Sequence, residues 1–295
     1  MQISAPAKIN LSLRVLRKRE DGFHEIETLM APIAIRDTID IERTENGGRL
    51  QPAVEIESAG RAKIHLACTD ASLPMDESNL VVRAVCAFGE ATGLQPHVHI
   101  FLRKEIPHGA GLGGGSSDAA ATLLALDALF QTQLPHADLT RIAAEIGSDI
   151  PFFLARSAAW CRGRGENVEP CALPYALPLL LVKPPFGVPT PWAYQRWRDS
   201  LEIPGVPYSS QAPQALGGIA LVNDLERPVF EKFIQLAEMK RWLLEQPEVA
   251  AALMSGSGST VFALLREKSA GPALAEKARE QFGEHTWLAL TETNP

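Results

Sequence analysis

A glycine-rich stretch at residues 109–115 constrains this chain more than any other part of its sequence. It holds five glycines in seven residues and lies between residues 97–103, which predict a strand, and residues 116–130, whose alanine and leucine content predicts a helix capped by Ser116 or Ser117. Glycine adopts positive φ and lets backbone N–H groups approach a ligand, and a helix N-terminus adds unpaired N–H groups and a partial positive charge. The pattern therefore predicts a phosphate-binding segment rather than a flexible surface loop. This phosphate segment consists of Pro107, His108, Gly109, Ala110, Gly111, Leu112, Gly113, Gly114, Gly115, Ser116 and Ser117.

Two other phosphate motifs do not fit the phosphate segment. Gly109, Gly111 and Gly114 match the spacing of the G-x-G-x-x-G dinucleotide fingerprint, but that fingerprint needs a second parallel strand after its helix, and residues 137–146 predict another helix. The Walker A pattern also fails, because no lysine follows the last glycine. A triphosphate bound here would need a cation from elsewhere in the chain.

The composition is that of an ordinary globular protein and argues against several classes. Of the 295 residues, 46% are hydrophobic and 21% are charged, and the net charge of -7 argues against a nucleic-acid-binding surface. No apolar run reaches the roughly 18 residues that a membrane helix needs. The start of the chain has no basic segment followed by a long apolar stretch, so no secretory signal is expected. The four cysteines show no CxxC spacing, which favours reduced thiols and a cytoplasmic location.

Residues 8–15 alternate between polar and apolar side chains, which predicts a strand with one buried face. Lys8 and Asn10 then share the other face, where a solvated lysine on an edge strand is the alternative to a functional one. Asp149, with Pro151 two residues later, predicts the start of a short helix. Further strands are predicted at residues 38–42, 54–57, 97–103, 179–183 and 260–265, and helices at residues 79–91, 116–130, 137–146, 231–246 and 272–282. This mixture of strands and helices without a regular alternation indicates an α+β class. Prolines become dense between residues 170 and 213, and a domain boundary is predicted near residue 155.

Five blocks of the sequence resemble one family in order and spacing. They begin at Pro6, Asp21, Gly111, Gly147 and Ser255 and read PAKINL, DGFH, GLGGGSSDAA, GSDIPF and SGSGS. The family is the galactokinase, homoserine kinase, mevalonate kinase and phosphomevalonate kinase superfamily of small-molecule kinases. Within it, PAKINL, DGFH and GSDIPF are similar to the members that phosphorylate the 2-hydroxyl of a cytidyl-diphosphate-linked methylerythritol in the non-mevalonate isoprenoid pathway.

The resemblance implies a two-domain α+β kinase with its active site in the cleft between the domains. Residues 1–155 would form an N-terminal ATP-binding domain and residues 156–295 a C-terminal substrate domain. ATP would be the phosphoryl donor, accompanied by Mg²⁺, with Ser117 as a hydroxyl contact near the ion. The sequence shows no carboxylate cage, which suits an ion held by phosphates and water. The partner would be a small molecule, with no nucleic acid and no membrane, and the chain would be a monomer or weak homodimer.

The resemblance also assigns roles to single residues. Asp149 matches the catalytic base that accepts the hydroxyl proton, although a helix N-cap is its alternative role. Lys8 matches the catalytic lysine, which would keep Asp149 ionised and neutralise charge on the transferring group. Asn10 would contact the substrate from the strand face of Lys8. Asn79 and Lys104 match positions near the nucleoside of ATP.

The DGFH block implies a pocket for cytosine. His24 matches the residue that reads the base edge, and Phe23 and Tyr194 match the aromatic pair that stacks on the base. Phe23 stands where the family often has tyrosine, so the stacking face is kept and a hydroxyl is lost. A structural role in a turn is the alternative for His24, and core packing is the alternative for Tyr194.

The sequence leaves other functions open. A homoserine or mevalonate type of kinase is one alternative, against which the DGFH block argues, and a non-catalytic nucleotide-binding relative is another, against which the presence of both Lys8 and Asp149 argues. Asp118 beside the phosphate segment should repel phosphate unless its side chain caps the helix or meets a basic group. For the HxH pair His97 and His99, a structural role is favoured over a metal site.

Overall fold

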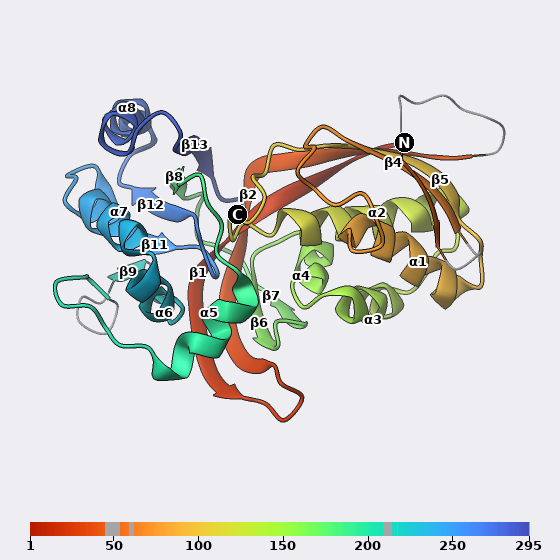
Figure 1. Ribbon diagram of the computed structural model, residues 1–295, viewed down its shortest axis with the longest axis horizontal. Helices are drawn as coiled ribbons and strands as arrows, with labels where there is room; N and C mark the ends of the chain where they lie inside the picture. Colours follow the sequence, from red (N-terminus) through yellow and green to blue (C-terminus); the bar gives the residue numbers. More distant parts are fainter. Residues whose placement is uncertain (45–53, 59–61, 209–213, 217, 295) are drawn as a thin grey trace. The chain divides into compact units, whose positions relative to one another are not determined.

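The structure, a computed structural model (Figure 1), describes residues 1–44, 54–58, 62–208, 214–216 and 218–294. The chain divides into two compact units that are interleaved along the sequence. Unit 1 consists of Met1–Ala7, Ile35–His108 and Gly113–Arg156, and unit 2 consists of Lys8–Ala34, Gly109–Leu112 and Ser157–Pro295. The assignment of ATP to residues 1–155 and of the substrate to residues 156–295 stays a prediction.

Unit 1 combines a mixed sheet with a group of helices. Its strands follow the order β3 (Val54–Ser58), β4 (Ala62–Cys68), β5 (His97–Arg103), β2 (His24–Arg43) and β1 (Gln2–Lys18), the last two with the parts that belong to this unit. β4 and β5 are parallel, since the chain crosses between them through α1 (Leu80–Thr92), whereas β2 and β5 are antiparallel. α2 (Gly114–Phe130) packs on α1 and α4 (Ile150–Ala155), and α3 (His136–Ile146) packs on the same two helices.

Unit 2 contains two groups of strands. The second part of β1 pairs in parallel with β10 (Ile219–Asn223), which pairs with β9 (Gln214–Leu216), while the first part of β2 pairs with β6 (Ala159–Gly163), and β6 with β7 (Asn167–Pro170). A separate antiparallel sheet has the order β11 (Val249–Met254), β12 (Val261–Leu265), β8 (Pro178–Lys183) and β13 (Trp287–Glu292). The helices are α5 (Thr190–Arg196), α6 (Glu226–Lys232), α7 (Ile234–Leu244) and α8 (Gly271–Phe282), with short 3-10 turns at Trp197–Asp199 and Lys268–Ala270. α7 packs on β11 and β12, and α8 packs on β8 and β13, so both helices bury an apolar face against this sheet (Figure 1).

The predicted α+β class is confirmed, and most predicted elements occur with small shifts of their ends. Two predictions about helices are wrong. The single helix at residues 231–246 is two helices, because Phe233 leaves the helical conformation (φ -111°, ψ 66°) and stacks on Phe186 at 5.4 Å between ring centroids. The helix after the phosphate segment begins at Gly114, before either serine, so neither Ser116 nor Ser117 is its N-cap. No helix among the described residues is long and apolar enough to span a membrane.

The first strand differs from its prediction in a way that matters for function. β1 lies between β2 and β10 in the sheet order, so it is not an edge strand. From Ala7 to Leu13 both of its faces are buried, and Lys8 and Asn10 are each 3% exposed. The prediction of one buried face is therefore wrong, because Gly111 and Gly256, from segments far along the sequence, lie against the face that carries Lys8 and Asn10. Lys8 is a buried ammonium, which needs hydrogen-bond acceptors around it.

Candidate active site

The phosphate segment has the backbone that its glycines predict. Gly109, Gly111 and Gly113 have φ of 65°, 75° and 72°, in the left-handed region that favours glycine. Gly113 is the N-cap of α2, and no side chain caps that end of the helix. The first backbone N–H groups of this seventeen-residue helix are thus left for a ligand, which suits the predicted phosphate contact.

Gly111 has no room for a side chain. A Cβ there would overlap the carbonyl oxygen of Ser255 and would lie 2.8 Å from that of Gly258. Residues 255–259, the serine loop, connect β11 to β12 and thus pack directly against the phosphate segment within unit 2. The Gly111 carbonyl accepts a hydrogen bond from Ser255 Oγ at 2.9 Å, and the Ala110 carbonyl accepts one from the backbone N–H of Thr260 at 3.1 Å. These contacts fix the shape of residues 109–112.

Lys8 is held beside the same carbonyl. Its Nζ donates to the Gly111 oxygen at 3.0 Å and to Asn10 Oδ1 at 2.7 Å, and its backbone N–H donates to the Leu112 oxygen at 2.9 Å. A Cβ on Gly256 would lie 3.3 Å from both Lys8 Nζ and Asn10 Oδ1, so the serine loop covers this pair. Within unit 2 the structure therefore brings together Lys8, Asn10 and Gly111 of the phosphate segment.

Two of the residues predicted to bind cytosine are in contact. The His24 ring stacks on the Tyr194 ring with 5.4 Å between centroids and 30° between planes, and Trp197 meets His24 edge-on at 6.1 Å. Burial and the nearby Lys18 ammonium lower the pKa of His24, which favours its neutral form at neutral pH. A neutral imidazole offers one donor and one acceptor, as a base edge requires.

Phe23 lies at the turn before β2 and is 49% exposed. The guanidinium of Arg164 lies 4.9 Å from its ring centroid, in a cation–π contact. One face of the ring is thus covered by a cation, and stacking of a base between Phe23 and Tyr194 stays a prediction. Arg164 and Trp197 were not singled out from the sequence, since their positions beside the DGFH block depend on contacts between distant segments.

Asp149 and Asn79 lie in unit 1. Asp149 occupies the N-cap position of α4, followed by a proline in the first turn as predicted, but its carboxylate makes no capping hydrogen bond. Asn79 is the N-cap of α1, where its Oδ1 accepts from the Val81 N–H at 2.9 Å and its Nδ2 donates to the Pro74 oxygen at 2.8 Å. The pairing of Asp149 with Lys8 and the contact of Asn79 with a nucleoside stay predictions.

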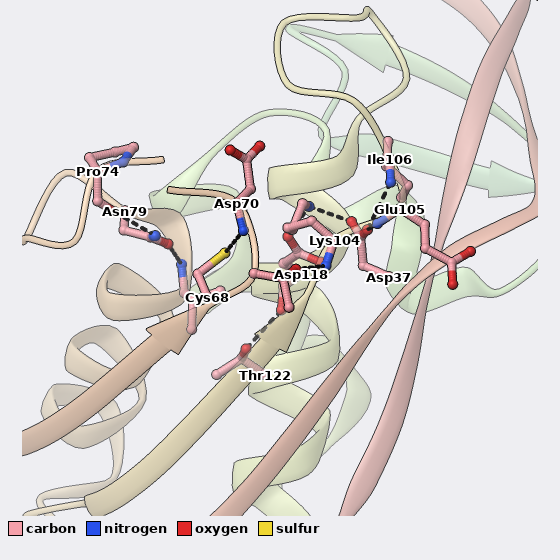
Figure 2. Close-up of polar contacts among 12 residues, drawn as sticks. Asp37, Cys68, Asp70, Pro74, Asn79, Lys104, Glu105, Ile106, Asp118 and Thr122 are labelled. Atoms are coloured by element: carbon pink, nitrogen blue, oxygen red, sulfur yellow. Dashed lines mark hydrogen bonds and ion pairs between the residues drawn. The ribbon is translucent and has the colours of Figure 1, made fainter. Parts of the chain in front are cut away.

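A buried cluster of charges lies at the base of the phosphate segment in unit 1 (Figure 2). The Lys104 ammonium pairs with Asp37 of β2 and, at 2.6 Å, with Asp118 of α2. Asp37 Oδ1 also accepts from the backbone N–H groups of Glu105 at 2.6 Å and Ile106 at 2.9 Å, directly before the phosphate segment. The cluster therefore connects residues 104–106, directly before the phosphate segment, with α2.

The electrostatics of this cluster explain where Asp118 points. Its side chain meets a basic group, one of the two outcomes expected from the sequence. Burial and the neighbouring Asp37 carboxylate, opposed by Lys104, raise the pKa of Asp118 to about 7. Burial lowers the pKa of Lys104, but the two carboxylates outweigh it and the net shift is upward. A Cβ on Gly114 would lie 3.3 Å from Lys104 Nζ, which places this cation under the first turn of α2, whereas its contact with a nucleoside stays a prediction.

Asp37 is a site residue that stands out in the apolar pattern of β2. Asp37 shares the alternation of Ile33, Ile39 and Ile41 along β2 and is completely buried. An acidic residue on the apolar side of a strand indicates a buried partner of opposite charge. The His99 ring stacks on the His65 ring at 4.3 Å between centroids, and no group of three or more metal-binding side chains occurs among the described residues. A structural role for His97 and His99 stays a prediction.

Comparison with known proteins agrees with this arrangement. The model of the GHMP kinases N terminal domain matches residues 79–156, and that of the GHMP kinases C terminal matches residues 212–284. A crystal structure of mevalonate kinase covers the whole chain at a TM-score of 0.66 and 13% identity, so it shares the fold. These matches define the class of the protein as a GHMP kinase.

More similar relatives narrow the class. A 4-diphosphocytidyl-2-C-methyl-D-erythritol kinase of Methylacidiphilum infernorum is 41% identical over 98% of this chain and 95% of its own length. A crystal structure of 4-(cytidine 5'-diphospho)-2C-methyl-D-erythritol kinase is 35% identical, with a TM-score of 0.74 over the whole of both chains. The chain therefore belongs to the 4-diphosphocytidyl-2-C-methyl-D-erythritol kinase family of the GHMP kinases, as its five sequence blocks predict.

Proposed function

We propose that this chain transfers the γ-phosphoryl group of ATP to the 2-hydroxyl of 4-diphosphocytidyl-2-C-methyl-D-erythritol. The relative from Methylacidiphilum infernorum, 41% identical over 98% of the chain, supports the substrate. The observation that carries the proposal is the buried Lys8 ammonium, 3.0 Å from the carbonyl oxygen of Gly111 in the phosphate segment. A cation at this place supplies the charge that the phosphate segment, which lacks a Walker lysine, does not contain.

The proposed reaction uses Asp149 as the base. Asp149 accepts the proton of the 2-hydroxyl as its oxygen attacks the γ-phosphorus, and the bond from that phosphorus to the bridging oxygen of ADP breaks. Lys8 stabilises the negative charge on the transferring group, and the backbone N–H groups at the start of α2 bind the other phosphates. Phosphoryl transfer needs mainly positioning and electrostatic stabilisation, which a rigid buried lysine provides.

The residues of the phosphate segment suit a nucleotide that carries Mg²⁺. Ser117 Oγ is buried and has no hydrogen-bond partner among the described residues, so it is free to contact the ion. The described residues contain no group of three or more metal-binding side chains, which suits an ion held largely by phosphates and water. When bound, Mg²⁺ neutralises charge on the phosphates.

Recognition of the cytidyl group is assigned to the turn before β2, to the first residue of that strand and to α5. His24 hydrogen-bonds the base edge in its neutral form, and Phe23 and Tyr194 supply aromatic faces for stacking. Asn10 contacts the substrate from the strand that carries Lys8. A monomer or weak homodimer located in the cytoplasm remains our expectation for the protein.

An assay of ADP release tests the proposal. Wild type and the variants Asp149→Asn and His24→Ala are offered MgATP with 4-diphosphocytidyl-2-C-methyl-D-erythritol, homoserine or mevalonate. We expect turnover only of the cytidyl substrate, loss of turnover in Asp149→Asn, and an increased KM for the cytidyl substrate with an unchanged KM for ATP in His24→Ala. Turnover of homoserine or mevalonate instead would overturn the cytosine pocket, and ATP binding without any turnover would favour a non-catalytic relative.

A further inference from the structure

A short relay of buried hydrogen bonds lies beneath Lys8 in unit 2. Lys8 Nζ donates to Asn10 Oδ1 at 2.7 Å, Asn10 Nδ2 donates to Thr28 Oγ1 at 2.8 Å, and Thr28 Oγ1 donates to the backbone oxygen of Ser12 at 2.6 Å. Thr28 comes from β2 and is 1% exposed, and the other three residues come from β1 and are each 3% exposed. Solvent therefore competes little with any of these bonds.

The direction of the relay is fixed at its far end. A backbone carbonyl can only accept, so the single hydroxyl hydrogen of Thr28 points to Ser12. The Thr28 oxygen is then an acceptor toward Asn10 and must face the NH₂ group of that amide. This sets the orientation of the Asn10 side chain, which leaves its oxygen, and not its NH₂ group, facing the Lys8 ammonium. With the amide reversed, its NH₂ group would face the Lys8 ammonium, two donors, and its oxygen would face the Thr28 oxygen, two acceptors.

We propose that Thr28 is a positioning residue, which orients the Asn10 amide so that its oxygen holds the Lys8 ammonium beside Gly111. The inference rests on the catalytic role proposed above for Lys8. Thr28 touches neither Lys8 nor the phosphate segment in the hydrogen bonds of the relay, so its effect passes through Asn10. Thr28 and His24, the residue proposed to bind the base edge, are four residues apart on β2 and therefore lie on the same face of that strand.

The experiment compares two substitutions at the same position. Thr28→Val keeps the shape of the side chain and removes the hydroxyl, whereas Thr28→Ser keeps the hydroxyl and removes a methyl group. We expect kcat to fall about tenfold in Thr28→Val, with KM for ATP within about twofold of wild type, because the lysine acts on the transferring group rather than on nucleotide binding. Thr28→Ser should retain kcat within about threefold, since the relay is intact.

A control separates positioning from loss of stability. Thr293 is also 1% exposed in unit 2, and its Oγ1 accepts from the Leu177 N–H at 2.9 Å. Thr293→Val should lower the melting temperature to a similar extent as Thr28→Val while leaving kcat unchanged. Equal kcat in Thr28→Val and wild type, or an equal loss in Thr28→Val and Thr28→Ser, would overturn the inference.

A crystal structure of Thr28→Val gives a readout that does not depend on turnover. We expect Asn10 to rotate and the contact between Asn10 Oδ1 and Lys8 Nζ to lengthen or break. An unchanged contact would refute the positioning role. If wild type phosphorylates none of the offered alcohols, the proposed function fails, and this structure still decides the inference.

Discussion

Each unit contains a buried lysine paired with carboxylates next to a glycine-containing loop, and the two clusters differ in their balance of charge. In unit 2, Lys240 and Glu226 form a one-to-one pair at 2.6 Å, with side chains 0% and 1% exposed. In unit 1, Lys104 faces two carboxylates, Asp37 and Asp118. When all groups are ionised, the Lys240 pair is neutral, whereas the Lys104 cluster carries one excess negative charge. Burial alone therefore does not decide whether a carboxyl of such a cluster is protonated.

Both carboxylate oxygens of the balanced pair accept a hydrogen bond. Glu226 uses Oε2 for Lys240 and Oε1 for the backbone N–H of Met254 at 2.9 Å, directly before the serine loop. Asn223 supports the same place, with Nδ2 bonds of 2.7 and 2.8 Å to the oxygens of Met254 and Gly256. This arrangement holds the serine loop in one geometry, and burial, opposed by Lys240, raises the pKa of Glu226.

The unbalanced cluster contains a carboxyl group, that of Asp118, which can take up a proton. Asp118 Oδ1 is buried and has no hydrogen-bond donor among the residues that the structure describes. Its carboxyl, with a pKa of about 7, takes up a proton close to neutral pH, which cancels the excess charge under the phosphate segment. The two clusters thus differ in charge balance: one is a one-to-one ion pair, and the other contains a carboxyl that titrates close to neutral pH.

The largest expected effect comes from Lys240→Met, which breaks the balanced pair. It leaves the Glu226 carboxylate buried without its cation, so the free energy of unfolding should fall by about 3–5 kcal/mol. Urea unfolding at pH 7 measures the loss. The double variant Lys240→Met with Glu226→Gln keeps an acceptor for Met254 and should recover most of it, and a double variant as unstable as the single one would show that charge is not the cause.

A smaller loss is expected from Lys104→Met in the unbalanced cluster. At pH 6 Asp118 is mostly protonated, and Asp37 keeps its two backbone N–H donors, so the cost should be about 2 kcal/mol. At pH 8 the cost should increase, because without the lysine the folded variant must keep Asp118 protonated at a pH where the wild type can ionise it. Urea unfolding at both pH values tests the difference, and a loss independent of pH would contradict the assignment of the titrating group.

Asp118→Asn should alter the pH dependence of stability more than stability itself. Since the pKa of Asp118 rises from 3.8 in the unfolded chain to about 7 in the folded one, wild type loses stability as pH rises between these values. Asparagine does not titrate, so between pH 6 and pH 8 wild type should lose about 1 kcal/mol relative to the variant. Parallel unfolding curves for the two proteins at pH 6, 7 and 8 would refute this.

The smallest effect is expected from Asp40→Asn on the same strand as Asp37. Asp40 pairs with Arg103 at 2.9 Å, but the arginine side chain is 50% exposed. Water screens this pair, so the free energy of unfolding should change by less than about 0.5 kcal/mol at any pH from 6 to 8. A loss close to that of Lys104→Met would mean that the position on β2, rather than burial, sets the cost.

Local patterns predicted much of this molecule, and contacts between distant segments account for the rest. The glycines at 109, 111 and 113 and the strand at residues 97–103 were predicted because the signals lie within a few neighbouring residues. Family membership came from blocks that keep their order along nearly the whole chain. The burial of Lys8 was not predicted, because Gly111 and Gly256, which lie against it, are far along the sequence. The break at Phe233 depends on Phe186 in another segment, and the partners of Asp118 depend on β2 and Lys104.

One hydrogen-bond acceptor of the site is a backbone atom, which substitution of its residue cannot remove. The oxygen that receives Lys8 and Ser255 belongs to the main chain of Gly111, so every amino acid at position 111 would carry it. Only glycine fits there, because any side chain would meet the serine loop. The position should therefore accept almost no change over evolutionary time. A compound that hydrogen-bonds the backbone of residues 109–112 would engage atoms that resistance mutations cannot replace without deforming the enzyme's own loop.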